Sequence, residues 1–313
     1  MKRILNFFKD DFNLYGTLAL IAFAGVIFCP TIAFAGTISG LKLWATVVLP
    51  GLFVAMILTS CILALFPMNN AVSYLYVMIA GIFCGFPVGA ILCGKLHEKN
   101  KSETICNRLI AFCNLSSPSF VANYIIFSSI GGRFPAFRVL LCIYLPVLEM
   151  LVYLMIRYRK EIFGENVKEQ GHIKTTEKKA SRRITRAKMV HILDQAITSS
   201  VKNMLKLGGY IVVFSCFAAY IVQIPFENDI LTAIICGITE ITNGIYLLSQ
   251  LHVDIRLIVL LIVGINALGG CSTLMQTAGM THGTGISIKK YIYYKLIFTV
   301  VTVINSAVII YVL

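Results

Sequence analysis

Four clusters of polar and helix-breaking residues interrupt apolar segments and could bind a ligand. They are GFPVG at Gly85 to Gly89, NLSSPS at Asn114 to Ser119, TEITNG at Thr239 to Gly244, and NALGGCS at Asn266 to Ser272, with Gln276 one turn further on. Glycine and proline break a helix and free backbone N–H and C=O groups, while Asn, Ser, Thr and Gln add neutral donors and acceptors. Such groups suit the binding of a small solute or an ion better than the breaking of a covalent bond.

Within these clusters we select the residues expected to contact a solute or a coupling ion. They are Gly85, Pro87, Gly89, Asn114, Ser116, Ser117, Glu240, Thr242, Asn243, Asn266, Ser272 and Gln276. Glu240 is the sharpest candidate, because an ionisable side chain inside a membrane segment is costly unless it is paired, protonated or in contact with water. We expect it to carry a coupling proton or to bind sodium; the alternative is a hairpin tip near the surface, with Glu240 in solvent.

No enzyme activity is expected from the sequence. It contains no HExxH motif, no recognisable pair of nucleophile and base, and no phosphate-binding glycine loop after a strand. Its ten cysteines are scattered, mostly within apolar segments, and none forms a CxxC pair. We therefore interpret them as small buried side chains and expect neither a metal site nor a cofactor.

The clusters belong to a chain that needs lipid as its solvent. Hydrophobic residues make up 58% of the sequence and charged residues 13%, and the mean hydropathy is +0.84. A helix needs about 20 apolar residues to cross a bilayer. The clearest such segments are Leu14 to Ala35, Trp44 to Phe66, Val139 to Ile156, Leu207 to Ile224, Leu257 to Leu268 with its continuation, and Tyr291 to Leu313. The sequence therefore predicts an all-α integral membrane protein.

The net charge of +13 is a signal of topology rather than of nucleic-acid binding, because Lys and Arg gather in short loops beside apolar segments. The basic cluster at Lys178 to Lys188 marks its loop as cytoplasmic. The earlier basic loop from Lys95 to Arg108 must then be cytoplasmic as well. This requires one preceding apolar segment to turn back before it crosses.

Two segments are predicted to turn back as re-entrant hairpins, about 71–96 and about 231–251. The first contains Gly85, Pro87 and Gly89 at its middle, and the second contains the TEITNG cluster. With these hairpins about six full spans remain, and the features follow the same order in both halves of the chain. The second half would be inverted relative to the first, an arrangement that is typical of secondary transporters with broken helices.

This topology divides the chain into an N-terminal transmembrane helix (1–38), a first repeat (39–157), a basic cytoplasmic loop (158–195) and a second, inverted repeat (196–313). The N-terminus also resembles a cleavable signal peptide, with Lys2 and Arg3 before an apolar run that ends in Ala33-Phe34-Ala35. We favour an uncleaved helix, because Asp10 and Asp11 interrupt the basic region and further spans follow.

Several motifs resemble those of the YlbJ-type sporulation integral membrane proteins, which carry the nucleoside-recognition or Gate domain. The resemblance covers nearly the whole chain and is carried by SGLKLWATVVLPGL at 39–52, GFPVGAIL at 85–92, RLIAFCNLSSPSF at 108–120, DQAITSSVKNMLKLGGYIVVFS at 194–215 and GITEITNGI at 237–245. It implies a fold like that of the concentrative nucleoside transporters, with two re-entrant hairpins and two broken helices around one site. It also implies a role in spore formation, with dipicolinic acid passing from the mother cell across the outer forespore membrane.

The expected function is therefore secondary transport of a small anionic metabolite, with dipicolinic acid as the leading substrate implied by the resemblance. One departure is that no Lys or Arg lies inside the four clusters, so a dianion would rely on half-helix N-termini, neutral donors and Lys206. A nucleoside-type carrier and a non-transporting scaffold in spore-envelope assembly are the alternatives. The expected partners are the solute and membrane lipid, without nucleic acid, and a homo-oligomer is left open.

Overall fold

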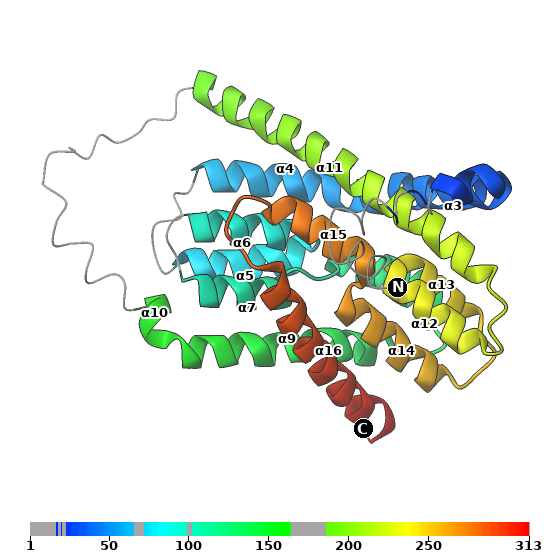
Figure 1. Cartoon of the computed structure of the whole chain (residues 1–313). Helices are drawn as coiled ribbons and strands as arrows, with labels where there is room; N and C mark the ends of the chain where they lie inside the picture. Colours follow the sequence, from blue (N-terminus) through cyan, green and yellow to red (C-terminus); the bar gives the residue numbers. More distant parts are fainter. Residues whose placement is uncertain are drawn as a thin grey trace, which may run out of the picture.

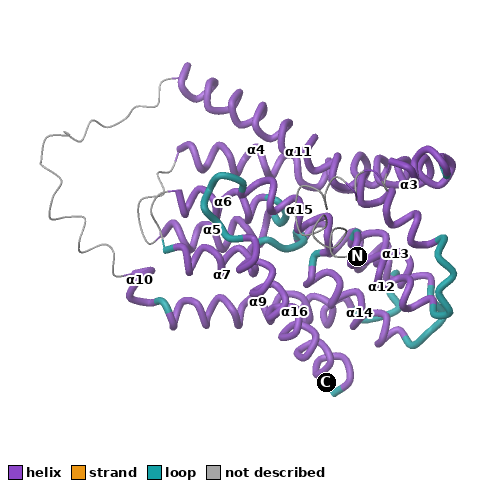
Figure 2. The backbone as a smooth tube through the Cα atoms, viewed as in Figure 1, coloured by secondary structure: helices purple, strands orange, loops and turns teal. Residues whose placement is uncertain are grey.

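The computed structural model describes residues 17, 20, 23–65, 72–98, 102–163 and 186–312 (Figures 1 and 2), and within these ranges the chain contains helices and no strand. The helices of the first half are α3 (Pro30–Leu43), the π-helix η1 (Trp44–Val48), α4 (Leu49–Leu65), α5 (Val72–Cys84), α6 (Val88–Glu98), α7 (Glu103–Cys113), α8 (Pro118–Phe120), the π-helix η2 (Val121–Ile130), α9 (Ala136–Arg157) and α10 (Arg159–Phe163). Those of the second half are α11 (Arg186–Val222), α12 (Asp229–Thr239), α13 (Ile241–Gln250), α14 (Ile255–Leu268), α15 (Gly270–Thr281) and α16 (Ile288–Tyr311).

Six helical stretches of the described chain are long and apolar enough to cross a membrane. They are Pro30–Ile62, Glu103–Ile130, Ala136–Arg157, Met189–Val222, Ile255–Thr281 and Ile288–Tyr311. The predicted all-α, multi-pass architecture is thereby confirmed at this level. Much of the basic loop predicted at 158–195, including most of its Lys and Arg cluster, and most of the first 22 residues lie outside the described residues.

The first spanning stretch joins parts of two apolar segments that the sequence predicted as separate, 14–35 and 44–66. Helices α3, η1 and α4 follow one another without interruption from Pro30 to Leu65, so the predicted junction between residues 38 and 39 falls within a helix. Pro30 occupies the first turn of α3, where a proline costs no intrahelical hydrogen bond. The stretch packs along α11, where an added Cβ on Gly36 would lie 2.7 Å from the Cα of Cys216. Trp44 adds a hydrogen bond of 3.1 Å from its Nε1 to the carbonyl of Met204.

Elements in the two halves follow the same order. Each half has a long helix (α3–η1–α4 or α11), a helical hairpin (α5–α6 or α12–α13), a broken helix (α7–α8–η2 or α14–α15) and a further long helix (α9 or α16). Figure 1 shows the two hairpins at opposite ends of the bundle, each with its bend toward the middle. The bends of both hairpins are thus directed toward the middle of the bundle.

Each break has a local cause in the sequence. Gly85, between α5 and α6, has a φ of 71°, and Gly269, between α14 and α15, has a φ of 86°, a conformation that favours glycine. Pro118 begins α8 and the Ser117 side chain caps it by accepting a hydrogen bond from the N–H of Phe120. Glu240 separates α12 from α13 and caps the N-terminus of α13 with its own carboxylate.

Candidate functional site

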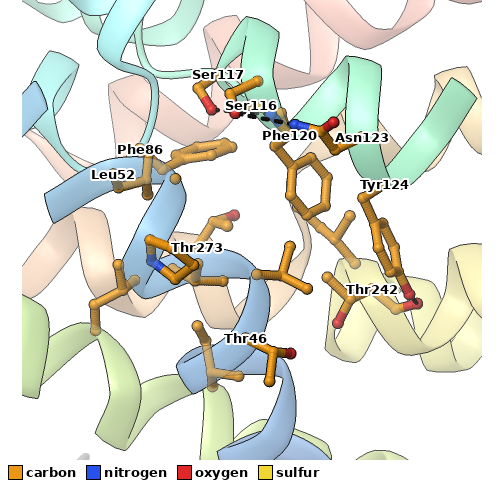
Figure 3. Close-up of a pocket in the computed structure, with 18 of the residues that line it drawn as sticks. Thr46, Leu52, Phe86, Ser116, Ser117, Phe120, Asn123, Tyr124, Thr242 and Thr273 are labelled. Carbon is orange, nitrogen blue, oxygen red and sulfur yellow. Dashed lines mark hydrogen bonds between the residues drawn. The ribbon is translucent and has the colours of Figure 1, made fainter. Parts of the chain in front are cut away.

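A cavity of about 480 Å³ lies between elements of both halves, and exposed residues such as Thr46 and Asn123 in its lining show that it opens at the surface of the bundle. Its wall is formed by η1 and the start of α4, the tip of the α5–α6 hairpin, the break before α8, η2, α11, the tip of the α12–α13 hairpin and α15. A volume of about 300–1,000 Å³ is usual for sites that hold small molecules. The cavity is therefore the candidate functional site (Figure 3).

The first half contributes the tip of its hairpin and the break in its long helix. The Phe86 N–H donates to the carbonyl of Leu115 over 2.7 Å, which ties the hairpin tip to the break. Ser116 and Ser117 follow directly, and both line the cavity. The Ser116 hydroxyl donates to Oδ1 of Asn266 on α14 over 2.6 Å, so this side of the cavity is joined to the second half of the chain.

The second half contributes a buried carboxylate. Glu240 is 4% exposed and lines the cavity. Its Oε2 accepts hydrogen bonds from the backbone N–H and the side-chain amide of Asn243, at 3.0 and 3.1 Å, and from the hydroxyl of Thr242. Since the N-terminus of a helix stabilises negative charge, α13 provides a suitable environment for the carboxylate. Glu240 is accordingly buried against the cavity rather than placed in solvent at a surface tip.

Gln276 on α15 supplies an unsatisfied acceptor. The side chain is 3% exposed and lines the cavity. Its Nε2 donates to the Ser272 hydroxyl over 3.0 Å, whereas its Oε1 is buried and has no hydrogen-bond partner. Most buried polar atoms in proteins are paired, so this unpaired acceptor beside the cavity is an exception.

Three aromatic side chains form another part of the wall. Phe86 comes from the hairpin tip, Phe120 from α8 and Tyr124 from η2, and Figure 3 shows all three beside the same space. The rings of Phe120 and Tyr124 are stacked with their centroids 5.1 Å apart. The Tyr124 hydroxyl donates to the carbonyl of Thr242 over 2.8 Å, which connects η2 to the second hairpin. These aromatic faces suit a flat ring in a ligand.

A buried lysine lies behind this wall. Lys295, on α16, is 3% exposed and donates hydrogen bonds from its Nζ to the carbonyls of Ala111 and Asn114 over 3.3 and 3.0 Å. Its Nζ is 5.4 Å from the centroid of the Phe86 ring. Lys206, which the sequence suggested as a partner for a dianion, is instead exposed and does not line the cavity.

Comparison with known proteins identifies the relatives of this chain. No protein-family model and no solved structure matches it. It is 26% identical to the sporulation integral membrane protein YlbJ of Bacillus subtilis (strain 168), over 94% of this chain and 81% of that protein. The chain is thus similar to the YlbJ-type sporulation membrane proteins over nearly its whole length. It is therefore a multi-pass membrane protein related to a sporulation protein, as the motifs predicted.

The candidate residues predicted from the sequence divide into two groups in this fold. Those that line the cavity are Ser116, Ser117, Glu240, Thr242 and Gln276. Those that are not part of the lining are Gly85, Pro87, Gly89, Asn114, Asn243, Asn266 and Ser272. Asn114, Asn243 and Asn266 of the second group form hydrogen bonds that join the elements of the wall, and Gly89 packs closely against the break.

Sequence reasoning missed the aromatic wall and Lys295. A local signal existed for Phe120 and Tyr124, because residues four apart lie on the same face of a helix and these two follow the NLSSPS cluster directly. No comparable signal existed for Lys295, which reaches the first-half break from the last helix.

Asn114 shows how the second group supports the wall. It is fully buried, and its Nδ2 donates to the Thr277 hydroxyl over 2.8 Å. Its Oδ1 accepts from the N–H of Ala90 over 3.2 Å. One side chain thus joins the first-half break to α6 and to α15.

We expect Asn114→Ala to lower the free energy of unfolding by about 2 kcal/mol, because it leaves the Ala90 N–H and the Thr277 hydroxyl without this partner. Asn123→Ala is the matched control, since Asn123 is exposed and has a single long hydrogen bond of 3.3 Å to Ser119. Denaturation of both purified variants in detergent should separate them. Equal unfolding midpoints would show that the Asn114 contacts contribute nothing to stability.

Proposed function

We propose that this protein is a secondary transporter that moves a small planar anion, with dipicolinic acid as the leading substrate, across the outer forespore membrane. The observation that carries the proposal is the cavity between the hairpin tips and helix breaks of the two halves. Irregular backbone at membrane depth is tolerated where it is covered by protein or lines a water-filled cavity. Transporters built from inverted repeats bind their substrates at such breaks near the bilayer midplane.

Helix length supports a re-entrant placement of both hairpins. Helix α5 has 13 residues and α12 has 11, which at 1.5 Å per residue gives lengths of about 20 and 17 Å. A hydrocarbon core is about 30 Å thick, so neither helix can cross it. Hairpins that enter from opposite sides would place their tips, Gly85 and Glu240, near the midplane.

The cavity has separate surfaces for the aromatic ring and for the two carboxylates of dipicolinate. A flat aromatic ring can lie against Phe86 or Phe120, while the hydroxyl groups of Ser117 and Ser119 and the amide of Asn123 can donate to carboxylate oxygens. The N-terminus of α8, which faces this region through its cap Ser117, favours negative charge.

The buried carboxylate of Glu240 favours the binding of a cation together with an anionic substrate. Like charges repel strongly where the dielectric constant is low, so a dicarboxylate beside Glu240 requires a proton or a cation in the same site. Coupled movement of a proton or a sodium ion is consistent with this requirement.

A nucleoside-type carrier is the second candidate, and a specific observation favours it. The aromatic wall, Glu240 and Gln276 line one cavity. These are groups that could stack on a base and accept hydrogen bonds from ribose hydroxyls or an exocyclic amine. A neutral nucleoside would also avoid repulsion by Glu240.

The proposal predicts uptake of labelled dipicolinate by liposomes that contain the purified protein under imposed proton or sodium gradients. Phe120→Ala should raise KM about tenfold, because it removes one aromatic face from the cavity. Phe127→Ala is the matched control, since Phe127 lies on η2 with its side chain 72% exposed and outside the cavity lining. Uptake should be unchanged in this control.

Competition separates the candidate substrates. Unlabelled nucleosides should leave dipicolinate uptake unchanged if the planar anion is the substrate, and they should be the transported species if the second candidate is right. If neither dicarboxylates nor nucleosides cross under either gradient, the transport proposal is wrong, and the scaffold alternative gains support.

A further inference from the structure

The end of α7 is a place where a membrane protein would be expected to bind a cation. The last carbonyl groups of a helix lack intrahelical partners and carry partial negative charge. In transporters with broken helices, unwound carbonyls and half-helix C-termini coordinate the coupling ion. Helix α7 ends at Cys113 inside the bundle, directly before the break that lines the cavity.

In this protein a side chain already fills that position. The Lys295 Nζ donates to the carbonyl of Ala111, in the last turn of α7, and to the carbonyl of Asn114 at its C-cap. Helix α16 (Ile288–Tyr311) carries the lysine and packs against α7. The ammonium group of Lys295 thus takes the position at the C-terminus of α7 that a bound cation could otherwise occupy.

The surroundings of Lys295 favour this interpretation over an ordinary ion pair. Among the described residues, no carboxylate forms a salt bridge with Lys295, and its hydrogen bonds to Ala111 and Asn114 both go to backbone carbonyls. A buried ammonium group needs compensating negative potential, and here it comes from the helix end and from the faces of Phe86 and Phe298, with centroids 5.4 and 5.5 Å from Nζ.

Lys295 is also adjacent to the cavity. Phe86 connects the two, because it lines the cavity and the centroid of its ring is 5.4 Å from the Lys295 Nζ. The Phe86 N–H donates a hydrogen bond to the carbonyl of Leu115. The carbonyl of the preceding residue, Asn114, accepts a hydrogen bond from Lys295. A cation at this position therefore fixes the part of the wall formed by the hairpin tip and the break.

The other negative group of the site is likewise occupied by donors from the protein. Glu240 accepts from Thr242 and Asn243, which belong to its own hairpin. All three of these bonds go to Oε2, so a sodium ion at Glu240 would have to bind through Oε1 and find its further oxygen ligands elsewhere.

We propose that the Lys295 ammonium replaces a coupling sodium ion at the end of α7, so that solute movement through the cavity does not depend on sodium. This inference rests on the proposed transport function and deepens it by assigning a residue to the cation position. It also makes a prediction about Lys295 that can be tested through cation binding, without any transported solute.

The experiment compares wild type with Lys295→Ala and Lys295→Met in sodium buffer and in N-methylglucamine buffer. Wild-type uptake in proteoliposomes should change less than about twofold when sodium is replaced. Lys295→Ala removes the ammonium and opens space at the carbonyls, so its uptake should fall about tenfold in sodium-free buffer and recover with sodium. Lys295→Met keeps the side-chain bulk without the charge, and sodium should not restore it.

A second measurement is independent of transport. Sodium should raise the midpoint of thermal unfolding of Lys295→Ala in detergent, because a ligand that binds only the folded state stabilises it. It should leave the midpoints of wild type and Lys295→Met unchanged. Lys289→Ala is the matched control, since it removes one positive charge from an exposed position of α16, and it should behave as wild type in both assays.

The outcomes are distinguishable. Wild-type uptake that falls about tenfold without sodium would overturn the inference even if Lys295→Ala did not fold. If the unfolding midpoint of Lys295→Ala does not respond to sodium, the inference is wrong. Lys295 would then only stabilise the C-terminus of α7. Absence of uptake for every solute tested would contradict the proposed function, while the unfolding measurement would still decide the role of Lys295.

Discussion

Replacing Glu240 with glutamine should lower the initial rate of solute uptake about 100-fold, equivalent to about 2.7 kcal/mol of transition-state free energy, while the protein still inserts and folds. Glutamine retains one side-chain oxygen that can accept from the Asn243 N–H, so the cap of α13 survives. It loses the negative charge, and its own amide group would face donors from Thr242 and Asn243. The cavity would then lack the charged group that we propose to couple the substrate to a cation.

Uptake in proteoliposomes measures this loss, and helical content and the unfolding midpoint show that the fold is retained. Glu227→Gln is the matched control, because Glu227 is an exposed carboxylate in the connection that precedes α12 and does not line the cavity. If Glu240→Gln transported at the wild-type rate, the carboxylate would be a helix cap alone. A scaffold would tolerate the change without loss of its role.

The helix breaks could be predicted from the sequence because their causes are local. Gly85 and Gly269 have positive φ, Pro118 begins a helix and Glu240 caps one, and each effect depends on a few neighbouring residues. The six apolar stretches follow from length and composition in the same way. The sequence therefore predicted where the breaks occur, and the candidate site was sought among them.

Which side of a break faces the cavity could not be predicted, because tertiary packing decides it. Ser116 and Ser117 line the cavity, while Asn114, two residues earlier, faces α6 and α15. Lys295 lies within the predicted span from Tyr291 to Leu313, and only the packing of α16 against α7 reveals its carbonyl partners. A single helix contains no information about the partner that its buried polar residue will meet.

Glycine is the residue type for which this distinction matters most. The sequence placed Gly89 among the candidate ligands, because glycine in a membrane segment can expose backbone to a solute. In the structure Gly89 is buried on α6 and packs against the end of α7, outside the cavity lining. Its absent side chain allows the first hairpin to approach the break.

Gly89→Ala is therefore expected to disrupt the fold rather than to alter substrate affinity alone. An added Cβ would lie 2.5 Å from the carbonyl oxygen and 2.8 Å from the carbonyl carbon of Cys113, and 3.0 Å from the Cα of Asn114. All three atoms belong to the backbone, which cannot rotate away as a flexible side chain can. We expect a loss of about 3 kcal/mol or more in the free energy of unfolding, together with loss of uptake, because the hairpin and the break must separate.

Gly209→Ala provides the matched control for this prediction. Gly209 lies within α11, and a Cβ added there would meet no atom within 4 Å. Alanine is favoured over glycine inside a helix by about 1 kcal/mol, so this variant should be as stable as wild type or slightly more stable, with uptake unchanged. Thermal unfolding in detergent and uptake in proteoliposomes test both variants. If Gly89→Ala unfolded at the wild-type temperature but bound its solute more weakly, Gly89 would act as a ligand, and the close packing of α6 against the break would not determine the shape of the cavity.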